Sequence, residues 1–95
     1  MSGDFDLIIR GGHLIDPKNQ LDGPVDIAVK DGLVAAVGAE ISAAAAVEID
    51  AAGLYVTPGL IDIHIHAYGG YRGWLFPDQH ALPYGVTTVV DTGGA

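Results

Sequence analysis

The sequence predicts a mixed β and α/β fold, in which β-rich residues 1–58 are followed by an α/β unit at residues 59–95. Two observations lead to this prediction. In the first segment, short runs of β-branched and apolar residues alternate with Gly, Pro, Asn and Asp, as in antiparallel hairpins. In the second, two nearly continuous apolar runs flank a long connection, which is typical of parallel strands covered by helices. Pro58 and Gly59 mark the boundary between them.

The β-rich segment contains four strand-like runs that we expect to form two hairpins. The runs are 5–10 and 13–16, joined by a turn at Gly11 and Gly12, and 25–30 and 33–37, joined by a turn at Asp31 and Gly32. Both turns hold residues that tolerate positive φ. The alanine-rich residues 39–47 predict a loop with at most one helical turn, and two short strands at 47–50 and 54–58 complete the segment.

The α/β unit consists of one strand at 60–66, a crossover, and a second strand at 86–92. Within the crossover, a short helix at 77–84 could begin at Pro77 or Asp78, since both residue types favour helix N-termini. The order of strand, helix and strand predicts one βαβ unit with parallel strands.

Composition excludes several classes of function. The 95 residues can build one small core, and four Lys+Arg against twelve Asp+Glu give a net charge of −8. This charge argues against nucleic-acid binding and against an anionic membrane surface. The chain has no Cys, so any metal must be held by nitrogen and oxygen ligands. It also lacks a signal-like N-terminus and a membrane-spanning apolar run, so we expect a cytoplasmic protein.

The run GLIDIHIH places Asp62, His64 and His66 at alternate positions of the predicted strand. Alternate side chains of a strand share one face, and the isoleucines between them face the opposite way, toward covering helices. The two histidines would lie roughly 6.6 Å apart along the strand, at about 3.3 Å per residue. Two imidazoles at that spacing can converge on one metal ion and form half of its ligand set.

Two interpretations of this motif remain open at this point. An isolated H-x-H in an apolar strand is more often two partly buried histidines with hydrogen-bond partners. If it is a metal site, further His or carboxylate ligands must come from elsewhere. In that case Asp62 is better placed to orient a ring or a neighbouring backbone group than to bind the metal itself.

The surrounding motifs favour the metal site. IIRGGHLIDP, DIAVKDGLVAAVG, VEIDAAGLYVTPGLIDIHIH and GVTTVVDTGG, in this order and spacing, resemble the N-terminal part of the amidohydrolase superfamily of metal-dependent hydrolases. The resemblance implies strands of a composite β-sandwich at 1–58 and the first βαβ unit of a (β/α)8 TIM barrel at 59–95, with the barrel incomplete in this chain. It also implies that His64 and His66 are metal ligands.

The activity that this resemblance implies is hydrolysis of C–N bonds (amide or amidine) or acyl esters of a small molecule. The implied cofactor is a divalent metal, with zinc as the leading candidate, as one or two ions. The other ligands in such enzymes are a carboxylated Lys or a Glu, two further His and an Asp, all of which would lie beyond Ala95. We therefore assign no catalytic residue within the chain and expect it to be inactive alone; a homo-oligomer remains open.

Tyr68 distinguishes the chain from dihydroorotase-like relatives, which carry an arginine two residues after the second histidine. This difference argues against dihydroorotate as the substrate. HAYGG and GVTTVVDTGGA instead resemble an amidohydrolase/deacetylase or adenine-deaminase-like subgroup. In the loop after the strand, Tyr68 and Arg72 are candidate substrate contacts, and the alternative is an aromatic cover over the crossover helix with Arg72 in solvent. His13, His80 and Asp91 receive no predicted metal role, and Asp91, at the end of the second strand, is expected to support the site indirectly or to form a loop turn.

A second class of function also fits the sequence. The chain could be a free-standing β-rich interaction or assembly module without catalysis, which uses the exposed parallel strand as an edge for pairing. A family member that has lost its metal is a third possibility, against which the presence of both His64 and His66 argues.

Overall fold

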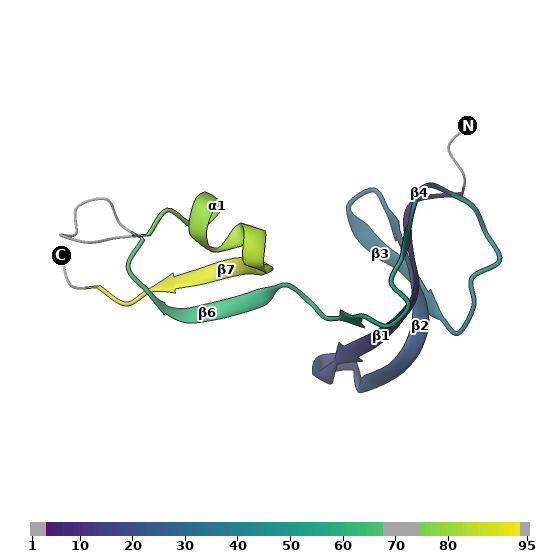
Figure 1. The fold of residues 1–95 in the computed structure, drawn as a ribbon, viewed down its shortest axis with the longest axis horizontal. Helices are drawn as coiled ribbons and strands as arrows, with labels where there is room; N and C mark the ends of the chain where they lie inside the picture. The colour runs from purple at the N-terminus through teal and green to yellow at the C-terminus, as the bar shows by residue number, and fades with distance from the viewer. Residues whose placement is uncertain (1–3, 68–74, 94–95) are drawn as a thin grey trace. The chain divides into compact units, whose positions relative to one another are not determined.

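The computed structural model describes residues 4–67 and 75–93, and the chain divides into two compact units (Figure 1). The first unit is Met1–Thr57 and the second is Pro58–Ala95. Among the described residues, the architecture is mostly β with one short α-helix. None of the helices in the described part of the chain is long and apolar enough to cross a membrane.

The first unit is a single mixed sheet of five strands in the described residues. Strand order is β3-β2-β1-β4, and β5 also pairs with β1. The strands are β1 (Phe5–Asp16), β2 (Leu21–Lys30), β3 (Leu33–Gly38), β4 (Ala45–Asp50) and β5 (Tyr55–Val56), with a short 3-10 helix η1 (Pro17–Asn19) between β1 and β2. β1 pairs antiparallel with β2 and parallel with both β4 and β5.

The predicted turn at Gly11 and Gly12 is wrong. β1 runs through both glycines as one twelve-residue strand, and its pairing with β2 shifts register between Ile9 and Gly12. Gly11 has a φ of 71° and adds one residue to the strand as a bulge. A Cβ on Gly12 would come within 2.5 Å of the Val56 side chain, so the second glycine permits close approach of β5. The hairpin partner of β1 is therefore β2, reached through η1.

The hairpin between β2 and β3 is confirmed, with Asp31 and Gly32 at positive φ values of 53° and 77°. These are the conformations that a two-residue hairpin turn of type I′ requires. The alanine-rich segment forms no helical turn: residues 39–44 are a loop, and β4 begins at Ala45. The last alanines of the segment belong to β4, which pairs in parallel with β1.

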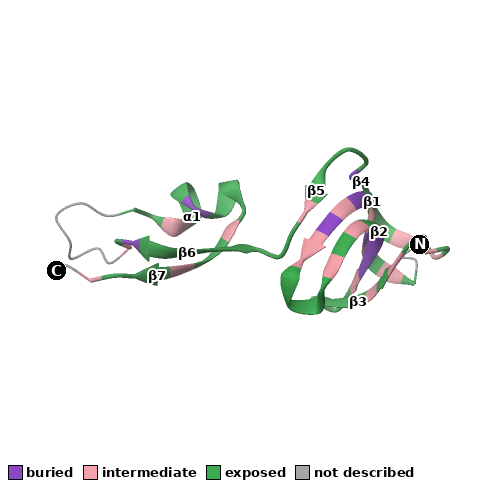
Figure 2. Ribbon diagram, turned by 90° about the horizontal axis from the view of Figure 1, so that it is seen from below, coloured by how far each residue is buried: buried purple, intermediate pink, exposed green. Residues whose placement is uncertain are grey.

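The core of the first unit lies on β1 and β2 and in the loop after β4, as the buried bands in Figure 2 show. Its buried apolar residues are Ile8, Leu14, Ile27, Ala28 and Ala51. Asp26, on β2, is only 5% exposed and is the single buried charged residue in the described part of the chain. A carboxylate in this position needs several partners, because burying a charge without them is costly.

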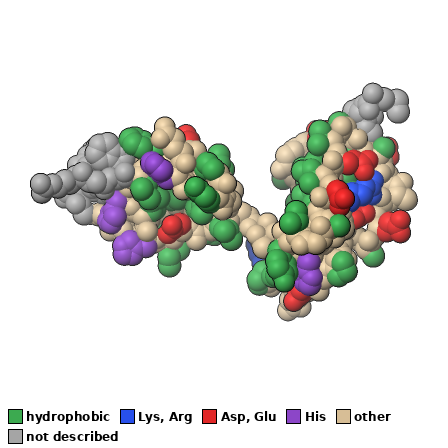
Figure 3. All heavy atoms as spheres, in the orientation of Figure 1, with side chains coloured by type: hydrophobic (Ala, Val, Ile, Leu, Met, Phe, Trp, Pro, Cys, Tyr) green, Lys and Arg blue, Asp and Glu red, His purple; other side chains and the backbone are tan. Residues whose placement is uncertain are grey.

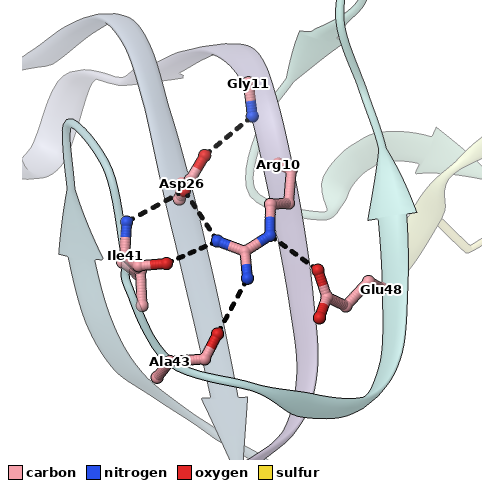
Figure 4. Close-up of polar contacts among 6 residues, drawn as sticks. All are labelled: Arg10, Gly11, Asp26, Ile41, Ala43 and Glu48. Carbon is pink, nitrogen blue, oxygen red and sulfur yellow. Dashed lines mark hydrogen bonds and ion pairs between the residues drawn. The ribbon is translucent and has the colours of Figure 1, made fainter.

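Asp26 finds these partners in a network with Arg10 and Glu48, which we call the Arg10 cluster (Figure 4). Its two oxygens accept the Gly11 N–H at 2.9 Å, the Ile41 N–H at 3.0 Å and an Arg10 nitrogen at 3.1 Å. Arg10 also donates to Glu48 at 2.7 Å and to the carbonyls of Ile41 and Ala43. The cluster thus ties β1, β2, β4 and the loop before β4 together.

The Arg10 cluster shifts the pKa of both its carboxyl groups downward. The Ile41 N–H, helped by the Gly11 N–H and Arg10, holds the pKa of Asp26 below its ordinary value of 3.8 even though burial acts in the opposite direction. The hydrogen bond from Arg10 lowers the pKa of Glu48 from its ordinary 4.5. Both carboxylates are therefore stabilised in their ionised form.

The second unit contains two parallel strands, β6 (Leu60–Ile65) and β7 (Val86–Asp91). Between them in the chain lie α1 (Pro77–His80) and a 3-10 turn η2 (Leu82–Tyr84). The predicted helix at 77–84 does begin at Pro77, but it is divided into these two short pieces. Pro83 has no N–H to donate and its ring crowds the preceding turn, which explains why the α-helix does not continue.

The expected helical cover over β6 is only partly present. Ile65 is 3% exposed, whereas Ile61 and Ile63 are 63% and 72% exposed. α1 has four residues, too few to cover a six-residue strand. The apolar face that the alternating pattern predicted does exist, but most of it is open to solvent in this chain (Figure 2).

Candidate functional site

The candidate site lies at the carboxyl end of β6, where Asp62, His64 and His66 follow one another at alternate positions. All three residues are exposed. The two imidazole rings have centroids 5.8 Å apart and meet edge to face, at an interplanar angle of 79°. The predicted pairing of the two histidines on one side of the strand is therefore realised, and Figure 3 shows histidine side chains on the surface of this unit.

The ring of His66 has a defined hydrogen bond. Its Nδ1 lies 2.8 Å from the carbonyl oxygen of Gly93, just after β7. A carbonyl oxygen can only accept, so Nδ1 carries the proton and donates. In the neutral ring, Nε2 then holds the lone pair, which is the state that a metal ligand requires.

Asp62 contacts the backbone of this same motif. Its Oδ1 accepts the backbone N–H of His64 at 3.0 Å. This bond fixes the main chain between the two residues, and it leaves the orientation of the His64 ring to other contacts. The sequence predicted that Asp62 orients either a histidine ring or a neighbouring backbone group, and in the structure it bonds a backbone group.

Asp91 joins the ends of the two strands, and one of its contacts is the loop turn expected from the sequence. Its Oδ2 accepts the N–H of Ala67 at 3.1 Å, and its Oδ1 accepts the N–H of Gly93 at 2.9 Å. The second contact forms an Asx turn, in which an Asp or Asn side chain accepts the backbone N–H of the residue two positions later. The sequence Asp-Thr-Gly at the end of a strand was the available signal for this turn.

His64 and His66 supply two neighbouring nitrogen donors at this site. No group of three or more His, Cys, Asp or Glu residues that could hold a metal ion occurs within residues 4–67 and 75–93. Two adjacent imidazoles, one of them with Nδ1 held by a carbonyl, match the nitrogen ligands that zinc and similar divalent ions accept. The residues therefore fit a metal that also has ligands from outside this set.

The remaining candidate residues are placed as follows. Tyr68 and Arg72, the two candidate substrate contacts, lie outside the described residues. His80 is exposed, and its Nδ1 accepts the N–H of Phe76 at the start of α1. His13 contacts Asp22 and the Tyr55 ring beside an open depression of about 360 Å³. That depression belongs to the first unit and does not include the histidine pair.

Comparison with known proteins gives sequence relatives over much of the chain. No protein-family model matches it. A dihydroorotase of Trichlorobacter lovleyi is 47% identical over 63 residues, which are 65% of this chain and 15% of the relative. Adenine deaminase 2 of Rhizobium etli is 44% identical over 90 residues, which are 90% of this chain and 15% of the relative. The chain thus spans about 15% of the length of these curated relatives.

Solved structures of related enzymes also resemble the chain. The chain resembles a crystal structure of an adenine deaminase with a TM-score of 0.78 and 39% identity, over 95% of this chain and 24% of that one. It also resembles the N-acyl-D-glutamate deacylase of Bordetella bronchiseptica, solved with zinc and a phosphonate inhibitor, with a TM-score of 0.70 and 34% identity. That match covers 92% of this chain and 18% of the deacylase chain.

Proposed function

The chain belongs to the amidohydrolase superfamily, and on this basis we propose that His64 and His66 are two ligands of a divalent metal centre. The enzyme that contains this centre would hydrolyse C–N bonds, of the amide or amidine type, or acyl esters of a small molecule. Its relatives are hydrolytic amidohydrolases, of which this chain represents a small part. The observation that carries the proposal is the pair of imidazoles 5.8 Å apart at the end of β6, with Nδ1 of His66 bound to a carbonyl.

The two histidines would act as neutral nitrogen donors. His66 would bind through Nε2, because its Nδ1 donates to Gly93. Asp62 would hold the backbone of the motif through the His64 N–H. A divalent ion bound there would lower the pKa of a water molecule and polarise the scissile carbonyl. The zinc named with the deacylase structure supports zinc as the candidate ion.

We also propose that residues 59–95 are the first βαβ unit of a (β/α)8 barrel and that residues 1–58 are strands of a composite β-sandwich. The parallel pairing of β6 with β7, with α1 between them in the chain, supports the first assignment. The exposed apolar side chains of Ile61 and Ile63 would be covered by barrel helices. In that architecture the end of β6 opens at the catalytic face, and the missing metal ligands come from other strands.

Isothermal titration with zinc tests the ligand assignment. The unaltered chain should bind zinc weakly, because two imidazoles are an incomplete ligand set. His64→Ala and His66→Ala should each reduce this binding to background. His80→Ala is the matched control, because it removes an exposed histidine of the same unit and should leave the affinity unchanged.

Two results would contradict the proposal in different ways. If the chain with both histidines replaced bound zinc as well as the unaltered chain, His64 and His66 would not be ligands. If the unaltered chain bound zinc tightly at a ratio of one and hydrolysed an acyl substrate, the expectation that it is inactive alone would be wrong.

A further inference from the structure

The contacts around His66 extend to a residue on the neighbouring strand, outside the Asp62, His64 and His66 motif. Asp91 is the last residue of β7 and pairs in register with Ile65, the neighbour of His66. We propose that Asp91 is a positioning residue for His66: it holds the loop carbonyl that fixes which ring nitrogen of His66 can bind a metal. This inference rests on the proposed metal centre.

The carboxylate of Asp91 bonds both loops that leave the strand pair. Oδ2 accepts the N–H of Ala67, the residue directly after His66, at 3.1 Å. Oδ1 accepts the N–H of Gly93, the residue whose carbonyl contacts the His66 ring, at 2.9 Å. One side chain therefore fixes the backbone on both sides of the ring contact, and an ionised acceptor makes such bonds stronger than a neutral one would.

These contacts form a closed circuit that begins and ends at His66. The ring donates from Nδ1 to the Gly93 carbonyl, the Gly93 N–H donates to Asp91, and Asp91 accepts the N–H of Ala67, which is bonded to His66. Gly93 has a φ of 87°, a left-handed conformation that a residue with a side chain rarely adopts. The Thr92 N–H also donates to the Ile65 carbonyl at 3.1 Å, which continues the strand pairing to this point.

The circuit has a chemical consequence for His66. With the Gly93 carbonyl in place, the neutral ring keeps its proton on Nδ1 and its lone pair on Nε2. Without it, the ring would be free to adopt the other tautomer, in which Nε2 carries the proton and cannot bind a metal. His64 differs, since its hydrogen bond with Asp62 involves its backbone N–H, while its ring meets the His66 ring edge to face.

The Asp91→Ala variant, followed by NMR of the histidine ring nitrogens, tests the inference. In the unaltered protein without metal, neutral His66 should be the tautomer protonated at Nδ1. In Asp91→Ala it should shift toward the tautomer protonated at Nε2, while the ring signals of His80 stay unchanged. Zinc affinity should fall by about 10-fold or more, as is typical when a residue that orients a metal ligand is removed.

Two further variants separate positioning from a general loss of structure. Asp91→Asn keeps one acceptor oxygen and should show a smaller tautomer shift than Asp91→Ala. Asp50→Ala removes a comparable contact in the first unit, where Oδ1 of Asp50 accepts the Ala52 N–H at 3.0 Å, and should leave His66 unchanged. Amide signals of β6 and β7 report whether each variant keeps the strand pair.

The outcomes distinguish this inference from the proposed function. If Asp91→Ala kept the strand pair and the Nδ1-protonated His66, the inference would be overturned while the metal ligands stood. If Asp91→Ala lost the strand pair, Asp91→Asn would be the test instead. An unshifted His66 tautomer in Asp91→Asn would then overturn the inference. If replacing His64 and His66 left zinc binding intact, the proposed function would fail whatever tautomer His66 adopts.

Discussion

The two units use their polar residues in opposite ways. In the first, Arg10 bonds both Asp26 and Glu48, which lie on two other strands, so that these charges are paired with one another inside the sheet. In the second, His64 and His66 lie exposed at the end of one strand, where the His66 ring bonds the Gly93 carbonyl and the His64 backbone bonds Asp62. Buried charges whose hydrogen-bond partners all come from the protein serve to stabilise the fold. Exposed polar side chains that are fixed by a few hydrogen bonds remain available for chemistry.

The largest expected effect is the loss of the Arg10 cluster. Asp26→Ala removes the acceptor of the Gly11 and Ile41 N–H groups and of Arg10. We expect it to lower the free energy of unfolding of the first unit by about 3 kcal/mol, since buried donors left without acceptors are costly. Urea unfolding followed by amide NMR signals of each unit measures this. A parallel loss in the second unit would contradict the separation of the two units.

A comparable test of the second unit is Gly59→Ala. A Cβ on Gly59 would lie 2.8 Å from the Cβ of Thr87 and would also overlap the rest of that side chain. Rotation of the threonine cannot move its Cβ, so the backbone must shift, and we expect a loss of about 2 kcal/mol. Gly23→Ala is the control, because a Cβ there meets nothing within 4 Å. Equal melting of the two variants would refute the predicted clash.

The two units should also differ in acid. The pKa values of Asp26 and Glu48 are lower in the folded state than their ordinary 3.8 and 4.5, so the unfolded state binds more protons in this range. Their stabilising contribution is therefore complete above about pH 4.5 and is lost as the pH falls through their folded values. Urea midpoints of the first unit between pH 6 and pH 3 should show this decrease, and the Glu48→Gln variant should weaken it.

The smallest effect on stability is expected at the contact between His13 and Asp22, which also joins a carboxylate to a nitrogen base but is exposed. Asp22 bonds His13, and its side chain is 74% exposed. Asp22→Ala should change the stability of the first unit by less than about 1 kcal/mol, because polar contacts exposed to solvent contribute little. The same urea titration measures it. A loss as large as that of Asp26→Ala would mean that burial does not separate the two contacts.

Local sequence signals predicted those parts of the structure that depend on neighbouring residues. Asp31 and Gly32 form the predicted turn because the residue types themselves set the backbone conformation. The same reasoning failed at Gly11 and Gly12, where a similar local signal, two residues that tolerate positive φ, marks a bulge. Whether a glycine pair turns the chain or bulges a strand is decided by the strand that pairs with it, and β2 is reached only after η1.

Contacts between distant residues could not be read from the sequence. Arg10 meets Asp26 across 16 positions and Glu48 across 38, and nothing near any one of them in the sequence indicates the others. The contact between His66 and Gly93 spans 27 positions in the same way. By contrast, the alternation of Asp62, His64 and His66 placed the two imidazoles together, because a strand has a period of two.

The sequence by itself determined the histidine pair, the apolar face of β6 and the turn between β2 and β3, since each follows from spacing along one segment. Only the tertiary structure decided that β1 is continuous, that Asp26 is buried among partners, and that the Gly93 carbonyl bonds the ring of His66 while Asp91 bonds the backbone of Ala67 and Gly93. The physical reason is that contacts between strands depend on which strands pair and in which register, and the preferences of neighbouring residues do not specify either.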